Sequence, residues 1–374
     1  MTTLKIDRAD VIAYRITAQG LHRTAASVTD LAVLDIGVQD TGAHAAQLAF
    51  DARLTKIPAP RSGPGQPLAL AWTLRGAPHL HRRRDLDRMA SALWPLSDAD
   101  ARTRLGETGA RSKQAALDGL RTFQAGVHAI REVVDVPMAK GAASAAITAA
   151  APQVLSRYCR VCKATHVSEL VMRLGSLPAG LELQPGTSPP VLVPRPRASR
   201  IDGVDLDALH ALVRAYLAML GPATSADVAG YLGARRADLE AVWPDGLTEV
   251  LVDGRPAWLP ADRVRTIRRP RRAEVVRLLG PFDPYLQARD RDLIVPDKAM
   301  HKALWPVLGR PGVLLADGEV VGSWRPRGSG TRLTIAVESF VPLPAATRAR
   351  VEAEAQRVAA VRAATEVQVS WTGG

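Results

Sequence analysis

The residue pattern at 204–260 is the feature that most constrains the fold of this chain. Apolar residues recur at helical spacing from 206 to 220, and a Gly-Pro pair ends that helix. Two shorter helical segments follow, and the second opens with Arg235 and Arg236. Asp253-Gly254 then offers the two-residue turn of a β-hairpin, because both positions tolerate the positive φ that the turn requires. Three helices followed by a hairpin predict a winged helix, although a small α+β domain of another kind has the same element order.

Two weaker copies of this pattern precede it, at 7–82 and at 140–194, each combining helical segments with apolar strands. The sequence therefore predicts an α+β protein with three tandem winged-helix domains and a C-terminal β-barrel-like domain. The expected boundaries are winged helix 1 at 1–97, connecting helices and winged helix 2 at 98–200, winged helix 3 at 201–270, and the β-rich domain at 271–374.

The last hundred residues change character. A hairpin is expected around Asp317-Gly318, followed by the strand TRLTIAVESF, a helix from about Ala345 to Ala364 and a final strand VQVSW. One helix among several strands predicts a small sheet or partly open barrel that the helix braces.

Charge and composition narrow the partner. Lys and Arg outnumber Asp and Glu by 49 to 37, which gives a net charge of +12. An excess of this size favours a polyanion, with nucleic acid ahead of an anionic membrane surface. No stretch approaches the roughly 18 apolar residues of a membrane span, and the N-terminal MTTLKIDRAD lacks the apolar core of a signal peptide. With only two cysteines, a reducing cytoplasm is the expected compartment.

Several strings resemble one known family. They are LRGAPHLHRR with ALWPLSDADA, CRVCKATHVSELVMRL, and GPFDPYLQARDRDLIVPD with VVGSWRPR. In this order they are similar to winged-helix DNA-binding proteins of the AlkZ-like DNA glycosylase family. The resemblance implies three winged helices and a β-barrel-like domain around a concave basic face that holds duplex DNA. It also implies excision of alkylated purines or of bulky or crosslinked adducts, without a cofactor, by a monomer associated with the nucleoid.

Members of that family commonly carry a Gln-x-Gln or Gln-x-Asp motif at the lesion. The corresponding stretch here is Ile36–Leu54, in which Gln39 takes the place of the second Gln and Gly37 that of the first. The resemblance thus makes Gln39 and Asp40 the candidate catalytic residues. An alkylated purine leaves as a neutral base, so the enzyme must mainly stabilise a cationic sugar and position a water, which a carboxylate and an amide can do.

Two functions remain open at this point. In the first, the chain is a monofunctional glycosylase, since no Lys stands in Ile36–Leu54 to form a Schiff base. In the second, Gln39 and Asp40 only cap the following helix, and the chain is a non-catalytic winged-helix DNA-binding protein, either a regulator or a lesion binder. Gly37, which has no side chain to act at a lesion, favours the second function.

The predicted DNA contacts are basic side chains that cluster at strand ends and helix starts, where phosphates are commonly bound. Any one of these arginines can instead belong to an ion pair, as the Asp290 and Asp292 interleaved among them allow. The set comprises Arg75, His79, His81, Arg82, Arg83, Arg84, Arg160, Lys163, Arg235, Arg236, Arg289 and Arg291.

Cys159-x-x-Cys162 with His166 suggests a zinc site, but a structural site uses four ligands and no second cysteine pair is present. Redox chemistry of the thioredoxin kind needs a βαβ context that is also missing. The prediction is therefore no metal, with packed, reduced cysteines at a helix–loop junction.

Overall fold

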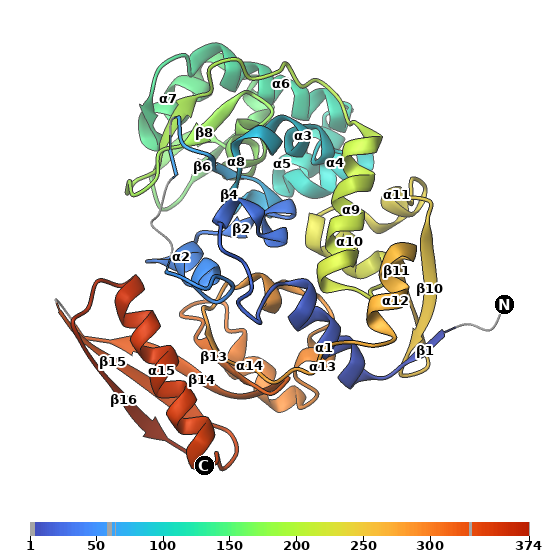
Figure 1. The fold of residues 1–374 in the computed structure, drawn as a ribbon. Helices are drawn as coiled ribbons and strands as arrows, with labels where there is room; N and C mark the ends of the chain where they lie inside the picture. The colour runs from blue at the N-terminus through green and yellow to red at the C-terminus, as the bar shows by residue number, and fades with distance from the viewer. Residues whose placement is uncertain (1–3, 58–61, 64, 329–330, 374) are drawn as a thin grey trace. The chain divides into compact units, whose positions relative to one another are not determined.

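A computed structural model describes residues 4–57, 62–63, 65–328 and 331–373 of the chain (Figure 1). The chain divides into two compact units. Unit 1 comprises Met1–Pro60, Tyr216–Thr224 and Gly246–Gly374, and unit 2 comprises Arg61–Ala215 and Ser225–Asp245. Across the described residues, the helices are too short or too polar to cross a lipid bilayer.

One sheet of unit 1 joins the N-terminus to the predicted hairpin. Strand β1 (Leu4–Ile6) runs parallel to β10 (Leu247–Val252), which pairs antiparallel with β11 (Arg255–Pro260). Asp253 and Gly254 have φ values of 46° and 80°, so the predicted turn is confirmed. Helix α1 (Arg8–Ala18) packs its apolar face on this sheet. Their shared core contains Ile6, Val11, Tyr14, Val250, Val252, Ala257, Leu259 and Ile267.

The second sheet of unit 1 is C-terminal and follows the order β12-β13-β14-β15-β16. These strands are Val276–Leu279, Gly312–Ala316, Glu319–Arg327, Arg332–Ser339 and Glu366–Thr372. Helix α15 (Ala345–Val361) connects β15 to the parallel β16 and lies along one face of the sheet (Figure 1). The predicted barrel-like closure is wrong: β12 and β16 are edges of an open sheet. The sheet is instead braced by α15, whose Val351, Ala355 and Val358 belong to its core.

Unit 1 also contains several short elements. They are β2 (Val38–Gln39), α2 (Ala45–Asp51), α12 (Val264–Ile267), η7 (Pro284–Gln287), α13 (Arg291–Ile294) and α14 (His301–Leu304).

Unit 2 is built on a sheet in which the strands follow the order β4-β3-β8-β9-β5. In chain order its strands are β3 (Leu68–Trp72), β4 (Pro78–Arg82), β5 (Met138–Ala139), β8 (Leu181–Leu183) and β9 (Val191–Pro194). Its helices include α3 (Leu86–Ala92), α4 (Asp98–Leu105), α5 (Glu107–Gln114), α6 (Gly119–Val133), α7 (Lys140–Ala150) and α8 (Glu169–Ser176). A separate hairpin consists of β6 (Ser156–Cys159) and β7 (Ala164–Val167).

The individual elements predicted for the third winged helix can be compared with the structure. The helices expected within 204–260 form as α9 (Leu206–Leu220), α10 (Ser225–Leu232) and α11 (Arg236–Glu240). Strands β3 and β8, which were assigned to the first and second winged helices, pair in one sheet through Leu70 and Leu183. The chain is therefore a mixed α+β protein with several sheets, and three separate winged-helix domains are not confirmed.

Candidate functional site

The candidate catalytic residues lie in unit 1 between β2 and α2. Gln39 ends β2 with only 9% of its surface exposed, and its Nε2 donates a 3.0 Å hydrogen bond to Oγ1 of Thr41. The Asp40 Oδ1 accepts the backbone N–H of Ala46 at 3.2 Å. Ala46 belongs to the first turn of α2, where backbone amides have no partner within the helix. Asp40 therefore caps α2 although it lies several residues before the helix. This agrees with the second sequence-based interpretation, in which Gln39 and Asp40 cap the following helix.

The capping role does not account for the electrostatics of Asp40. Burial raises the pKa of its carboxyl above the ordinary value, while the Ala46 N–H and the nearby His44 oppose that shift. The pKa of His44 is lowered, first by burial and then by the charge of Arg362. A half-buried carboxylate thus stands beside a histidine that is neutral at pH 7.

Sequence reasoning missed two members of this group, His44 and Arg362. His44 could have been found from its place four residues after Asp40. Arg362 follows the end of α15 and comes near His44 only through the fold, so the sequence gave no local signal for it.

Gly37 has a conformational reason to be glycine. Its φ is 81°, in the left-handed region that residues with a Cβ rarely adopt. A glutamine at this position would be strained. The missing side chain is therefore weak evidence that a catalytic group has been lost.

Buried ion pairs hold α2 in place. Asp51, its last residue, pairs with Arg357 of α15 at 2.6 Å. Arg53, two residues later, makes two 2.8 Å hydrogen bonds to the carboxylate of Asp283, and both side chains are fully buried. The loop that carries Gln39 is followed by a helix whose end is fixed at two points within unit 1.

The two histidines predicted to contact DNA are buried in unit 2. His79 and His81 lie on β4 with 2% and 0% of their surfaces exposed, and burial lowers the pKa of each to about 3. His79 Nδ1 lies 2.9 Å from the carbonyl oxygen of Ala77, and His81 Nε2 lies 3.1 Å from the Thr73 hydroxyl. They are neutral core residues, and their burial argues against the predicted phosphate contact.

In the arginine triplet that follows them, Arg82 and Arg83 form ion pairs within unit 2, whereas Arg84 is exposed. Arg82 is 9% exposed and lies 3.5 Å from Asp85. Arg83 forms an ion pair with the buried Glu182 and donates to the Gln66 carbonyl at 2.8 Å. Arg84 keeps 80% of its side chain exposed. Of the three, only Arg84 presents most of its side chain to solvent.

Arg75 is also engaged inside unit 2. Its guanidinium donates to the Tyr231 carbonyl and lies 5.2 Å from the centre of the Tyr231 ring. It helps to line a largely apolar cavity of about 220 Å³, whose wall also contains Trp72, Phe123 and Leu174. Arg75 therefore shapes a cavity in this structure.

The remaining predicted contacts are mostly at the surface. In unit 2, Arg160 and Lys163 are exposed, and Arg235 and Arg236 are about half exposed or more, with ion pairs to Asp238 and Glu240. In unit 1, Arg289 is exposed, whereas Arg291 lies 5.0 Å from the centre of the Trp305 ring. The interleaved carboxylates pair elsewhere, Asp290 with the buried Arg15 at 2.6 Å and Asp292 with Lys298 at 3.2 Å.

A basic run in unit 1 was missed although its signal is plain. The segment RVRTIRRPRR at 263–272 contains six arginines in ten residues. All six are exposed. Among the described residues, only Arg263 and Arg272 have acidic partners, Asp262 and Glu274, which lie one and two positions away in sequence. This segment is the densest group of cations on the described surface of unit 1.

Comparisons with known proteins point in one direction. The model of the family described as DNA glycosylase AlkZ-like matches residues 28–361. Among solved structures, Streptomyces sahachiroi DNA glycosylase AlkZ is similar with a TM-score of 0.75 and 21% sequence identity, over 99% of this chain and 100% of that one. At this identity the likeness concerns the fold alone. None of the curated proteins matches the chain.

Proposed function

Since the chain belongs to the AlkZ-like DNA glycosylase family, we propose that it is a monofunctional DNA glycosylase that excises alkylated purines or bulky adducts from duplex DNA. The proposal rests on the adjacent residues Gln39 and Asp40, which lie just before helix α2. Burial raises the pKa of the Asp40 carboxyl. As a DNA repair enzyme it would act on genomic DNA, in keeping with the expected cytoplasmic, nucleoid-associated location.

The chemistry assigns a role to each residue. A purine alkylated at N3 or N7 is cationic and leaves without protonation by the enzyme. The Asp40 carboxylate would stabilise the positive charge that develops on the sugar. Thr41 fixes the orientation of the Gln39 amide by accepting from its Nε2, so Oε1 is the end that would accept a hydrogen bond from the attacking water. His44, neutral at pH 7, could carry the proton that this water loses.

The DNA contacts would come from the exposed cations of both units. These are Arg84, Arg160, Lys163, Arg235, Arg236, Arg289 and the run at 263–272. If about six phosphates are contacted, affinity should fall by roughly 10³-fold between about 50 and 200 mM salt. A salt-independent affinity would contradict the electrostatic part of the proposal.

Excision from duplex oligonucleotides that contain 7-methylguanine, read as strand cleavage after alkali, tests the proposal directly. Gln39→Ala and Asp40→Asn should lose excision while retaining lesion binding. Asp30→Asn removes a charge from an exposed site of unit 1 and serves as the matched control, which should keep the wild-type rate. Wild-type rates in both Gln39→Ala and Asp40→Asn would refute the site assignment.

A non-catalytic DNA-binding function is the second candidate, because the hydrogen bond from Ala46 already gives Asp40 a structural role. It predicts salt-dependent binding to duplex DNA with no excision of 7-methylguanine or of a bulky adduct by the wild-type protein. Excision of either lesion would eliminate it.

A further inference from the structure

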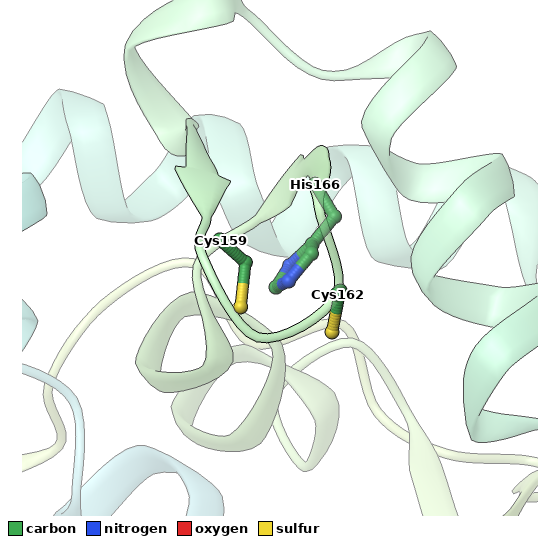
Figure 2. A group of neighbouring side chains, drawn as sticks. All are labelled: Cys159, Cys162 and His166. Carbon is green, nitrogen blue, oxygen red and sulfur yellow. The ribbon is translucent and has the colours of Figure 1, made fainter.

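Three metal-ligating side chains converge on one hairpin of unit 2. Strands β6 and β7 pair so that Arg157 stands opposite His166 and Cys159 opposite Ala164. Cys159 and His166 therefore share a face of the hairpin, because side chains two residues apart point the same way. Cys162 lies in the intervening turn, and the ligand atoms of the three residues lie within 4.8 Å of one another (Figure 2).

This arrangement corrects the expectation of packed cysteines. Cys159 is half-buried and Cys162 is exposed, and they lie on a hairpin instead of a helix–loop junction. Residues 164–167 form β7, and the helix of the expected junction begins only at Glu169. Lys163, with a φ of 53°, bends the chain back immediately after Cys162.

The hydrogen bonds of the hairpin prepare its ligands for a cation. The backbone amide of Cys162 and the His166 side chain both hydrogen-bond to Cys159. His166 Nδ1 donates to the Val167 carbonyl at 2.8 Å, which leaves Nε2 as the nitrogen available to a metal. An imidazole oriented by a backbone carbonyl through its other nitrogen is the usual arrangement at metal sites.

We propose that Cys159, Cys162 and His166 bind one Zn²⁺ ion, with a water molecule as the fourth ligand. Two thiolates and an imidazole suit Zn²⁺, with Zn–S of about 2.3 Å and Zn–N of about 2.0 Å. Tetrahedral bonds of these lengths place two sulfurs about 3.8 Å apart, so ligand atoms already within 4.8 Å need little movement. Binding releases the thiol protons to solvent, and the two thiolates neutralise the charge of the ion.

The ion would fix the hairpin that carries Arg160 and Lys163. Both cations are exposed and lie in the turn between the strands, next to the ligands in sequence. The same hairpin leads through Ser168 into α8, where Leu170 and Leu174 line the cavity of unit 2. The site would thus hold a surface loop and the start of a cavity-lining helix in one conformation, and it does not depend on the proposed glycosylase activity.

Co²⁺ and Zn²⁺, added to the reduced full-length protein, are the probes. Co²⁺ should produce thiolate charge-transfer bands and the visible bands of a tetrahedral ion, and Zn²⁺ should remain bound at one ion per chain after desalting. Cys159→Ser, Cys162→Ser and His166→Ala should each lose these signals. His128→Ala removes an exposed histidine of α6 and should keep them.

Thiol reactivity gives a second measurement, because the chain contains only these two cysteines. With Zn²⁺ at about 100 times its Kd, the fraction of free site, and hence the rate of thiol modification, should fall about 100-fold and recover when a chelator is added. Equal reactivity with and without Zn²⁺ would overturn the proposal. So would a stable Cys159–Cys162 disulfide in a protein that, once reduced, binds neither ion, since the pair would then be a redox couple.

Discussion

Replacing Asp40 by two different residues separates its two roles. An asparagine side chain retains an oxygen that can accept the Ala46 N–H but carries no charge, whereas alanine removes both. Loss of a helix cap costs about 1 kcal/mol, so Asp40→Ala should destabilise unit 1 by about that amount. Asp40→Asn should stay within about 0.5 kcal/mol of the wild type, because the burial that raises the Asp40 pKa also makes its charge unfavourable.

The excision rates of the two variants should follow a different order from their stabilities. If the carboxylate stabilises the sugar cation, removing its charge should slow excision by about 10²-fold or more in both variants. At about 1.36 kcal/mol per tenfold, this is about 2.7 kcal/mol in the activation free energy, well above either stability effect. Urea denaturation and single-turnover excision of 7-methylguanine measure the two quantities. If Asp40→Asn excised at the wild-type rate while Asp40→Ala was destabilised, Asp40 would be a cap and nothing more.

Three further outcomes are expected. Asp283→Ala leaves the fully buried Arg53 without its carboxylate partner and should lower the free energy of unfolding by about 3–5 kcal/mol in urea denaturation. A decrease below about 1 kcal/mol would mean that water or another group replaces the carboxylate. Because burial raises the pKa of Asp40, excision should begin to fall, as pH decreases, at a higher pH than for an ordinary aspartate. Over the same interval the folded state takes up a proton that the unfolded state does not, so wild-type stability relative to Asp40→Asn should rise as pH falls through the folded pKa, and parallel pH profiles would contradict the burial argument. Finally, the double variant Arg268→Ala with Arg269→Ala should lower the slope of log affinity for duplex DNA against log salt by about 1.8 if each contacts one phosphate, and an unchanged slope would remove the run at 263–272 from the interface.

Local sequence signals predicted most elements of the fold. The Asp-Gly pairs at 253 and 317 specify tight turns by their tolerance of positive φ, and both hairpins form at those positions. The family resemblance is confirmed by the match over residues 28–361. How strands pair over long distances could not be predicted. The pairing of Leu70 with Leu183 and of Leu4 with Val250 depends on packing between segments more than a hundred residues apart.

The candidate site could be predicted only in part, because it also depends on packing between segments that are far apart in the sequence. The motif residues Gln39 and Asp40 are local, whereas the pKa of His44 is lowered first by burial and then by Arg362, more than three hundred residues away. His79 and His81 illustrate the opposite error. Next to three arginines they are typical of a phosphate-binding cluster, yet β4 is buried on both faces from His79 to Arg82.

The distribution of arginine explains how a chain with many buried cations can still present a basic surface. Each buried arginine described above, such as Arg15 with Asp290 or Arg53 with Asp283, is matched by a carboxylate and adds nothing to the net charge of +12. The excess must therefore come from cations without acidic partners. Composition can report the size of that excess, but only the pairing found in the fold can assign part of it to Arg289 and to the arginines of the exposed run at 263–272 other than Arg263 and Arg272. If these cations bind duplex DNA, ionic strength should weaken binding without altering the buried pairs that hold the site, because salt screens exposed charges far more than buried ones.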